Sequence, residues 1–166
     1  MLHKKAPTPL YAVTAGIVRR NGRVLVAQRP ADKLLGGLWE FPGGKLEPGE
    51  SLDDCLRREL REELGIQVAV GRQVLTLKHA YTHFSIRLSV FECSLSKGDP
   101  RPLQVAALKW ARPADLGNFA MGKTDRQIAE WVQRRNSPTP PLDRRGQAAR
   151  REPIGADRIQ PTSRQP

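Results

Sequence analysis

Residues 44–66 read GKLEPGESLDDCLRRELREELGI, and this stretch joins a glycine turn to a segment with clear helix signals. Ser51 is a favourable helix N-cap, and Gly65 follows Leu64 at the position where a C-terminal glycine commonly ends a helix. A leucine recurs at every fourth position: Leu52, Leu56, Leu60 and Leu64. The stretch therefore predicts one helix over residues 52–64 that packs a leucine stripe on a sheet.

The same helix is predicted to carry an acidic edge beside its leucine stripe. Glu59, Glu62 and Glu63 are i, i+3 and i+4 neighbours, so their carboxylates crowd together and repel each other unless a cation binds there. Mg²⁺ binds through a few carboxylates together with phosphate oxygens of a substrate. Arg58 precedes Glu62 by one turn and is placed to orient that carboxylate. Taken alone, the acidic run also fits a solvated surface of the helix.

The whole stretch matches the pattern G-x5-E-x7-R-E-U-x-E-E-x-G-U, with U aliphatic, at every defined position. These positions are Gly44, Glu50, Arg58, Glu59, Leu60, Glu62, Glu63, Gly65 and Ile66. The chain thereby resembles the Nudix hydrolases, and the resemblance extends from about Tyr11 to Arg135. It implies an α/β/α sandwich with a mixed sheet between helices, and hydrolysis of the diphosphate linkage of a nucleotide.

The resemblance also implies a metal site and catalytic residues. The metal ligands would be the carboxylates of Glu59, Glu62 and Glu63 and the carbonyl of Gly43, with Arg58 as a further catalytic residue. The expected cofactor is Mg²⁺, with Mn²⁺ able to substitute. Such ions polarise the diphosphate and activate an attacking water.

Two stretches, residues 28–32 and 38–45, look like the MutT branch of the family, the 8-oxo-dGTP diphosphatases that remove oxidised guanine nucleotide from the precursor pool and so avoid mutation. The nucleotide contacts would then fall on Arg29 and on the segment Glu40, Phe41, Pro42 and Gly43, with Lys123 as the best match to a base-recognising asparagine. One alternative stays open at this point, and one position departs from the MutT pattern. CTP pyrophosphohydrolases share much of the same stretch, and a downstream acidic residue of MutT falls on the neutral Gln104.

A second resemblance leads to a different class of function. Residues 79–84 and 119–124 look like the C-terminal domain of MutY glycosylases, a module that reads 8-oxoguanine in DNA. His83 would then touch a base or a phosphate, or serve only as a structural loop histidine. Because every carboxylate of the signature is intact, an enzyme is favoured over a DNA-binding module.

The rest of the chain contains strand signals and one further helix. Asn21-Gly22 between branched runs predicts a hairpin. The predicted strands are residues 11–19, 23–29, 66–70, 73–79, 84–95 and 107–110, and residues 124–135 are predicted to form a closing helix.

Length and composition bound the organisation of the chain. At 166 residues one domain is expected, over residues 10–136, with a flexible N-terminus over 1–9 and a disordered basic tail over 137–166. The net charge of +11 favours polyanionic partners such as nucleotides. No run is long and apolar enough to cross a membrane, so a cytoplasmic protein is expected. The expected oligomeric state is a monomer. Cys55 and Cys93 are expected to be buried reduced thiols.

Overall fold

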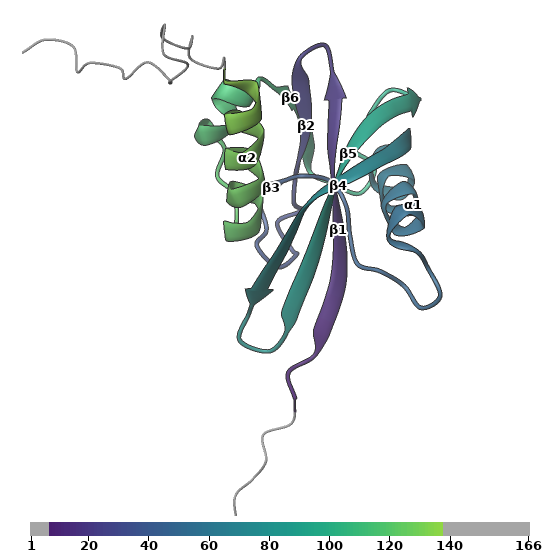
Figure 1. Ribbon diagram of the computed structural model, residues 1–166, viewed down its shortest axis with the longest axis vertical. Coiled ribbons are helices and arrows are strands. Elements are labelled where there is room, and N and C mark those ends of the chain that lie inside the picture. The colour runs from purple at the N-terminus through teal and green to yellow at the C-terminus, as the bar shows by residue number, and fades with distance from the viewer. Residues whose placement is uncertain (1–6, 138–166) are drawn as a thin grey trace, which may run out of the picture. The chain divides into compact units, whose positions relative to one another are not determined.

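The computed structural model describes residues 7–137, which form one mixed sheet with a helix on each side (Figure 1). The strands are β1 (Leu10–Arg20), β2 (Arg23–Gln28), β3 (Trp39–Glu40), β4 (Gln67–Ala80), β5 (Ser85–Lys97) and β6 (Ala107–Ala111). The helices are α1 (Leu52–Leu64), the 3-10 helix η1 (Pro113–Asn118) and α2 (Lys123–Asn136). The predicted α/β/α sandwich is confirmed.

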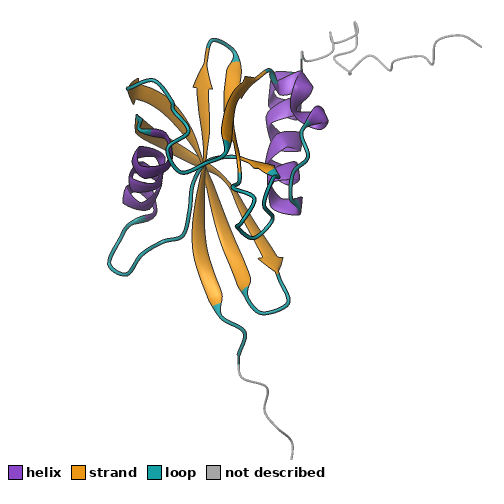
Figure 2. Cartoon of the chain, turned by 180° about the vertical axis from the view of Figure 1, so that it is seen from behind, coloured by secondary structure: helices purple, strands orange, loops and turns teal. Residues whose placement is uncertain are grey.

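The sheet runs in the order β3-β2-β1-β5-β4, and β6 also pairs with β2. Figure 2 shows the sheet and the helices on its two sides from behind. β1 and β5 are parallel, from Leu10 opposite Ser85 to Arg19 opposite Ser94, whereas the other pairings are antiparallel. Because β4 is antiparallel to β5, the start of β1, the start of β5 and the end of β4 meet at one end of the sheet. Side chains far apart in the sequence are thereby brought together.

The hairpin between β1 and β2 forms where the sequence predicted it. Asn21 and Gly22 both have positive φ, at 50° and 72°, as a two-residue turn of type I′ requires. The turn leaves Arg20 opposite Arg23 in the ladder.

Two apolar cores lie on opposite faces of the sheet, as strand alternation requires. On β2, Val24 and Val26 belong to the core beneath α2, whereas Leu25 belongs to the core beneath α1. Each helix buries one stripe: Ile128, Ala129 and Val132 from α2, and Leu56, Leu60 and Leu64 from α1. Both cysteines are buried and free, in agreement with the prediction.

Helix α1 begins and ends as its sequence predicts. The Ser51 hydroxyl accepts a hydrogen bond from the Asp54 N–H at 3.1 Å. At the other end, Gly65 adopts the left-handed conformation with φ 69°, and its N–H donates to the Arg61 carbonyl at 3.0 Å. The helix is thus fixed by its own residues at both ends, which positions its acidic edge.

The structure differs from the sequence prediction in three elements. β4 is one continuous strand in place of two, because bulges between Val70 and Gln73 absorb the residues that interrupt the alternation. β3 and η1 were not predicted. β3 has only two residues and is defined by its pairing with β2, so no local pattern reveals it.

The predicted tail, apart from Ser137, and residues 1–6 of the predicted flexible N-terminus lie outside the described residues. Within the described range, neither α-helix has the length and apolarity needed to span a bilayer.

Candidate active site

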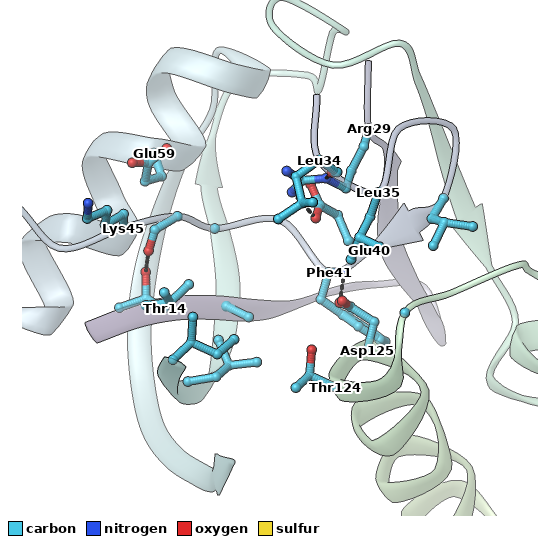
Figure 3. A pocket seen from close by; sticks show the side chains of 18 of the residues that line it. Thr14, Arg29, Leu34, Leu35, Glu40, Phe41, Lys45, Glu59, Thr124 and Asp125 are labelled. Atoms are coloured by element: carbon cyan, nitrogen blue, oxygen red, sulfur yellow. Dashed lines mark hydrogen bonds and ion pairs between the residues drawn. The ribbon is translucent and has the colours of Figure 1, made fainter. Parts of the chain in front are cut away.

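A pocket of about 370 Å³ extends from the acidic edge of α1 to the first turn of α2 (Figure 3). Its apolar wall comes from β1 and β5 through Val13, Ala15, Ile86 and Leu88. We call its two ends the α1 end, lined by Gly43, Gly44, Lys45, Glu59 and Glu63, and the α2 end, lined by Arg29, Glu40, Tyr81 and Asp125. The exposed leucines Leu34 and Leu35 also line the pocket.

The α1 end is built on a strap, residues 41–46, that lies along β1. The N–H of Gly16 donates to the Pro42 carbonyl and the N–H of Thr14 to the Gly44 carbonyl, both at 2.8 Å. Within the described residues the carbonyl of Gly43, between them, accepts no hydrogen bond. Successive carbonyls of an extended segment point in opposite directions, so the Gly43 oxygen faces away from β1. It is available as an oxygen ligand, as the sequence prediction requires.

Both glycines of the strap approach other groups closely. A Cβ atom at Gly43 would lie 2.1 Å from the Thr14 carbonyl oxygen. A Cβ atom at Gly44 would lie 2.3 Å from the carboxyl carbon of Glu59. Glycine is therefore required at position 43 by the approach to the β1 backbone, whereas a side chain at position 44 would displace the Glu59 carboxylate.

The three predicted carboxylate ligands do not share one environment. Glu59 and Glu63 line the pocket, whereas the side chain of Glu62 is 48% exposed and does not line it. Burial raises the pKa of Glu59 above its ordinary value. The acidic edge therefore directs two carboxylates inward and leaves Glu62 at its outer rim.

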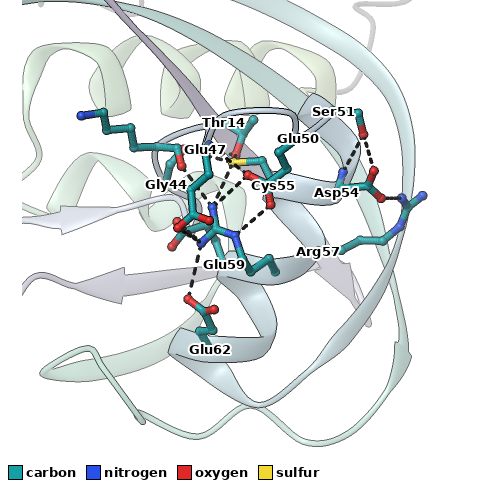
Figure 4. A network of polar contacts seen from close by, with 12 residues as sticks. Thr14, Gly44, Glu47, Glu50, Ser51, Asp54, Cys55, Arg57, Glu59 and Glu62 are labelled. Carbon is teal, nitrogen blue, oxygen red and sulfur yellow. Dashed lines mark hydrogen bonds and ion pairs between the residues drawn. The ribbon is translucent and has the colours of Figure 1, made fainter.

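Figure 4 shows Glu50, Glu59 and Glu62 together at this edge, and Arg58 contacts all three carboxylates. Its guanidinium donates to both oxygens of Glu50, at 2.8 and 3.0 Å, and to Glu59 at 2.8 Å. The predicted pair with Glu62 is present at the longer distance of 3.4 Å. The hydrogen bonds from Arg58 lower the pKa of Glu50 to about 2, so this carboxylate is ionised at neutral pH. Arg58 thus orients Glu50 and Glu59 more closely than Glu62.

Glu63 carries an unsatisfied polar atom. Its Oε2 is buried and has no hydrogen-bond partner within the described part of the chain. Burial, and next the charges of Glu40 and Glu59, raise the pKa of Glu63 to about 8. A buried carboxyl oxygen without a partner is costly unless a ligand satisfies it.

The α2 end contains an ion pair and a buried acid. Arg29 Nη1 and Glu40 Oε2 are 2.7 Å apart, and Arg29 Nε donates to the Leu34 carbonyl at 2.7 Å. Asp125 accepts a hydrogen bond from the Phe41 N–H at 2.9 Å, and burial raises the pKa of Asp125 to about 7. Burial also raises the pKa of Glu40, against the opposing effect of Arg29. Asp125 can therefore change protonation near neutral pH.

Four of the predicted substrate contacts line the pocket: Arg29, Glu40, Phe41 and Gly43. Pro42 and Lys123 do not, and Lys123 is exposed. Near Lys123 the pocket is lined by Gly122, Thr124 and Asp125, and Asp125 is the ionisable residue among them. Helical periodicity carries the missed signal, because Asp125 precedes the buried Ala129 by four residues, whereas Lys123 precedes the exposed Gln127 by four.

Two further residues raised by the sequence resemblances occupy peripheral positions. His83 is exposed in the turn between β4 and β5 and does not line the pocket, although its neighbours Tyr81 and Phe84 do. Gln104 is exposed, and its N–H lies 3.2 Å from the Glu63 carbonyl, at the end of α1. This contact joins backbone groups, and Gln104 does not line the pocket.

The residues at the α1 end fit a divalent cation. Among the described residues no set of three or more His, Cys, Asp or Glu side chains already converges as a complete metal site. The pocket nevertheless presents the unpartnered Glu63 Oε2 and the free Gly43 carbonyl, and Glu59 lies against the strap. These are hard oxygen donors, which suit a cation that completes its coordination with water or phosphate oxygens.

Comparisons with known proteins agree with this geometry. A family model described as the NUDIX domain matches residues 13–131. The CTP pyrophosphohydrolase of Escherichia coli is 38% identical over 121 residues, which cover 73% of this chain and 90% of that protein. The 8-oxo-dGTP diphosphatase of Proteus vulgaris is 42% identical over 80 residues, covering 48% and 71% of the two chains.

Solved structures show the same fold. The solution structure of the E. coli ORF135 protein has a TM-score of 0.68 at 35% identity, and the match covers 78% of this chain and 93% of that chain. The family model spans most of the described residues, including Gly44, Glu59 and Glu63 at the α1 end of the pocket. The chain therefore belongs to the Nudix family and is a Nudix hydrolase.

Proposed function

We propose that this Nudix hydrolase uses Mg²⁺ to hydrolyse 8-oxo-dGTP to 8-oxo-dGMP and pyrophosphate, and that it acts as a monomer. The observation that carries the proposal is the continuity of one pocket from the acidic edge of α1 to the carboxyl groups of Glu40 and Asp125. Phosphates belong at the α1 end, where a cation offsets their charge. The base belongs at the α2 end, because ionisable carboxyl groups suit the N–H and carbonyl groups of a purine edge.

Nudix hydrolases generally use divalent cations, and here Gly43, Glu59, Glu62 and Glu63 would hold Mg²⁺ or Mn²⁺. The cation supplies charge neutralisation of the diphosphate and a more acidic bound water. The chain's own residues prepare this end. Arg58 fixes Glu59 through a 2.8 Å contact, and the strap presents the Gly43 carbonyl. Hydrolysis consumes one water and breaks the bond between the α-phosphate and the pyrophosphate group.

Recognition of the oxidised base follows from its chemistry. Oxidation at C8 turns N7 of guanine from a hydrogen-bond acceptor into an N–H donor. The pocket contains carboxyl oxygens that accept such a bond, on Glu40 and Asp125. With unmodified dGTP the same oxygen would face an acceptor, and leaving a buried polar group unpaired costs about 1 to 3 kcal/mol. We expect a preference in kcat/KM for 8-oxo-dGTP over dGTP of at least about tenfold.

A CTP or dCTP pyrophosphohydrolase is the second candidate, because the E. coli relative of that name is similar along 90% of its length. Carboxyl groups at the α2 end also suit the amino group of cytosine. A third reading, a module that binds 8-oxoguanine in DNA, is less favoured because Glu59 and Glu63 are intact and line the pocket.

One panel of substrates separates these candidates. Purified protein with Mg²⁺ is incubated with 8-oxo-dGTP, dGTP, CTP and dCTP, and pyrophosphate release is measured. The highest kcat/KM for 8-oxo-dGTP would support the proposal, whereas the highest kcat/KM for CTP or dCTP would show that the second candidate function is correct. No turnover, together with salt-dependent binding of duplex DNA that contains 8-oxoguanine, would support the binding module.

A further inference from the structure

Tyr81 is a pocket residue that neither the Nudix signature nor the predicted nucleotide contacts include. It follows the last residue of β4 and opens the turn to β5. Its backbone N–H donates to the Phe84 carbonyl at 2.7 Å, which closes the turn. The backbone of Tyr81 is therefore fixed where the hairpin reaches the pocket.

Aromatic contacts fix the Tyr81 ring as well. Phe84 stacks on it with ring centroids 4.7 Å apart and planes at 27°, and His79 meets it edge to face at 4.5 Å. The ring centroids of Phe84 and Tyr11 are in turn 5.8 Å apart. Both rotatable bonds of the Tyr81 side chain are thus restrained by packing. Little freedom remains to be lost when its hydroxyl meets a ligand.

The hydroxyl of Tyr81 lies in the electrostatic neighbourhood of the α2 end. Burial, and next the charge of Asp125, raise the pKa of the phenol; the charge of Arg29 lowers it, and that of Glu40 raises it further. The phenol is consequently protonated at neutral pH, and it can donate one hydrogen bond and accept others. Within the described residues it makes no hydrogen bond of its own. The carboxyl groups nearby disfavour a phosphate at this end and favour the polar edge of a neutral base.

We propose that the Tyr81 hydroxyl hydrogen-bonds to the edge of the nucleobase, beside Asp125 and Glu40, and that Tyr81 is a specificity-determining residue of the pocket. This inference rests on the proposed function in one respect, that the substrate is a nucleotide whose base occupies the α2 end. It does not require that the base be 8-oxoguanine.

The test replaces Tyr81 by Phe, which removes only the hydroxyl and keeps the aromatic contacts. Tyr11→Phe is the matched control, because Tyr11 belongs to the same aromatic row and does not line the pocket. The base is bound alike in the ground state and the transition state, so we expect Tyr81→Phe to raise KM about tenfold with kcat little changed. Tyr11→Phe should change neither constant.

A binding measurement separates base recognition from a general disturbance of the pocket. Calorimetric titration with 8-oxo-dGMP and with 2-deoxyribose 5-phosphate compares ligands with and without a base. We expect Tyr81→Phe to weaken binding of the first about tenfold and to leave the second unchanged. Equal weakening of both, or unchanged binding of 8-oxo-dGMP by a variant that melts like the wild type, would overturn the inference.

The two proposals can fail separately. If the wild type turns over CTP or dCTP best, the Tyr81 experiment is carried out with that triphosphate and its monophosphate. A raised KM there supports the role of Tyr81 while the 8-oxo-dGTP assignment falls. Unchanged KM of Tyr81→Phe on the preferred triphosphate removes Tyr81 from base recognition even where 8-oxo-dGTP is that substrate.

Discussion

At the scale of single residues, Glu63 combines a buried oxygen without a partner and a pKa raised to about 8. Without a bound cation the carboxyl is therefore mostly protonated at neutral pH. A divalent cation at the α1 end would reverse this, because it stabilises the ionised form, and cation binding would release a proton. Under the proposed function, Glu63 would make the affinity for the cation depend on pH.

Glu63→Gln is expected to reduce kcat by at least about a hundredfold with Mg²⁺ present, because the amide cannot supply the anionic oxygen that the cation requires. The melting temperature of the metal-free protein should not fall, since glutamine resembles the protonated carboxyl in shape. Glu130→Gln, on the exposed side of α2, is the control. Turnover near the wild-type rate would exclude Glu63 from the metal site.

Asp125 is expected to make the free energy of unfolding depend on pH. Its pKa is raised from 3.8 to about 7, so between these values the folded protein keeps a proton that the unfolded chain has released. The stabilisation from Asp125 is therefore complete below about pH 4 and is lost as the pH rises through about 7. Asp125→Asn, which keeps an oxygen for the Phe41 N–H, should flatten the dependence of unfolding free energy on pH.

Urea denaturation of the metal-free protein from about pH 5 to about pH 8 measures this slope. The exposed Asp32→Asn is a control that should leave the slope unchanged. Parallel curves for the wild type and Asp125→Asn would show that Asp125 ionises alike in the folded and unfolded chains.

At the scale of elements, the strap over residues 41–46 and helix α1 form one unit, since the strap runs along β1 at a distance that only glycine permits. Gly44→Ala would place a methyl group 2.3 Å from the Glu59 carboxyl carbon. Either the carboxylate or the strap must move, and a shift of about 1 Å near reacting groups costs roughly a hundredfold in rate. We expect kcat for the preferred triphosphate to fall accordingly.

Gly117→Ala in η1 is the matched substitution, because the added methyl group would meet only Gln133, at 4.0 Å. Thermal melting and kcat of this variant should resemble those of the wild type. A Gly44→Ala variant with the same kcat as Gly117→Ala would show that the Glu59 position is not critical.

At the scale of the whole molecule, the net charge and the C-terminal residues 138–166 are expected to affect the encounter with nucleotides. The net charge of +11 favours encounter with anionic nucleotides, and part of it comes from arginines beyond Ser137: Arg144, Arg145, Arg150, Arg151, Arg158 and Arg164. The composition of this segment offers few apolar side chains to bury. Deleting residues 138–166 should change the melting temperature by less than about 2 °C and leave kcat unchanged.

Differential scanning fluorimetry and steady-state kinetics on the truncated chain check this expectation. Association driven by charge is screened by salt, so any fall in kcat/KM should appear at low ionic strength and vanish near physiological salt. A melting temperature lowered by several degrees would show that the segment contributes to the stability of the domain.

The sequence by itself determined the α1 end of the pocket. Ser51, Gly65 and the leucine stripe define α1 through contacts within a few residues, and the carboxylates of Glu59 and Glu63 follow from its periodicity. Gly44 adjoins the helix in the chain as well as in space. A motif whose parts are local in sequence is readable because its geometry depends on backbone propensity and capping alone.

The sequence resemblance named Arg29 and Glu40, but only the tertiary structure placed Tyr81 and Asp125 with them at the α2 end. Arg29, Glu40, Tyr81 and Asp125 come from four separate segments, and they meet because β1 pairs in parallel with β5 and α2 packs across the same sheet. Strand register and helix packing follow from burial summed over both cores, which no short pattern encodes. For the same reason the sequence indicates Lys123 as a nucleotide contact, whereas in the structure Asp125 lines the pocket and Lys123 is exposed. The sequence also places Glu62 with Glu59 and Glu63, but the structure leaves the Glu62 side chain more exposed, at the rim.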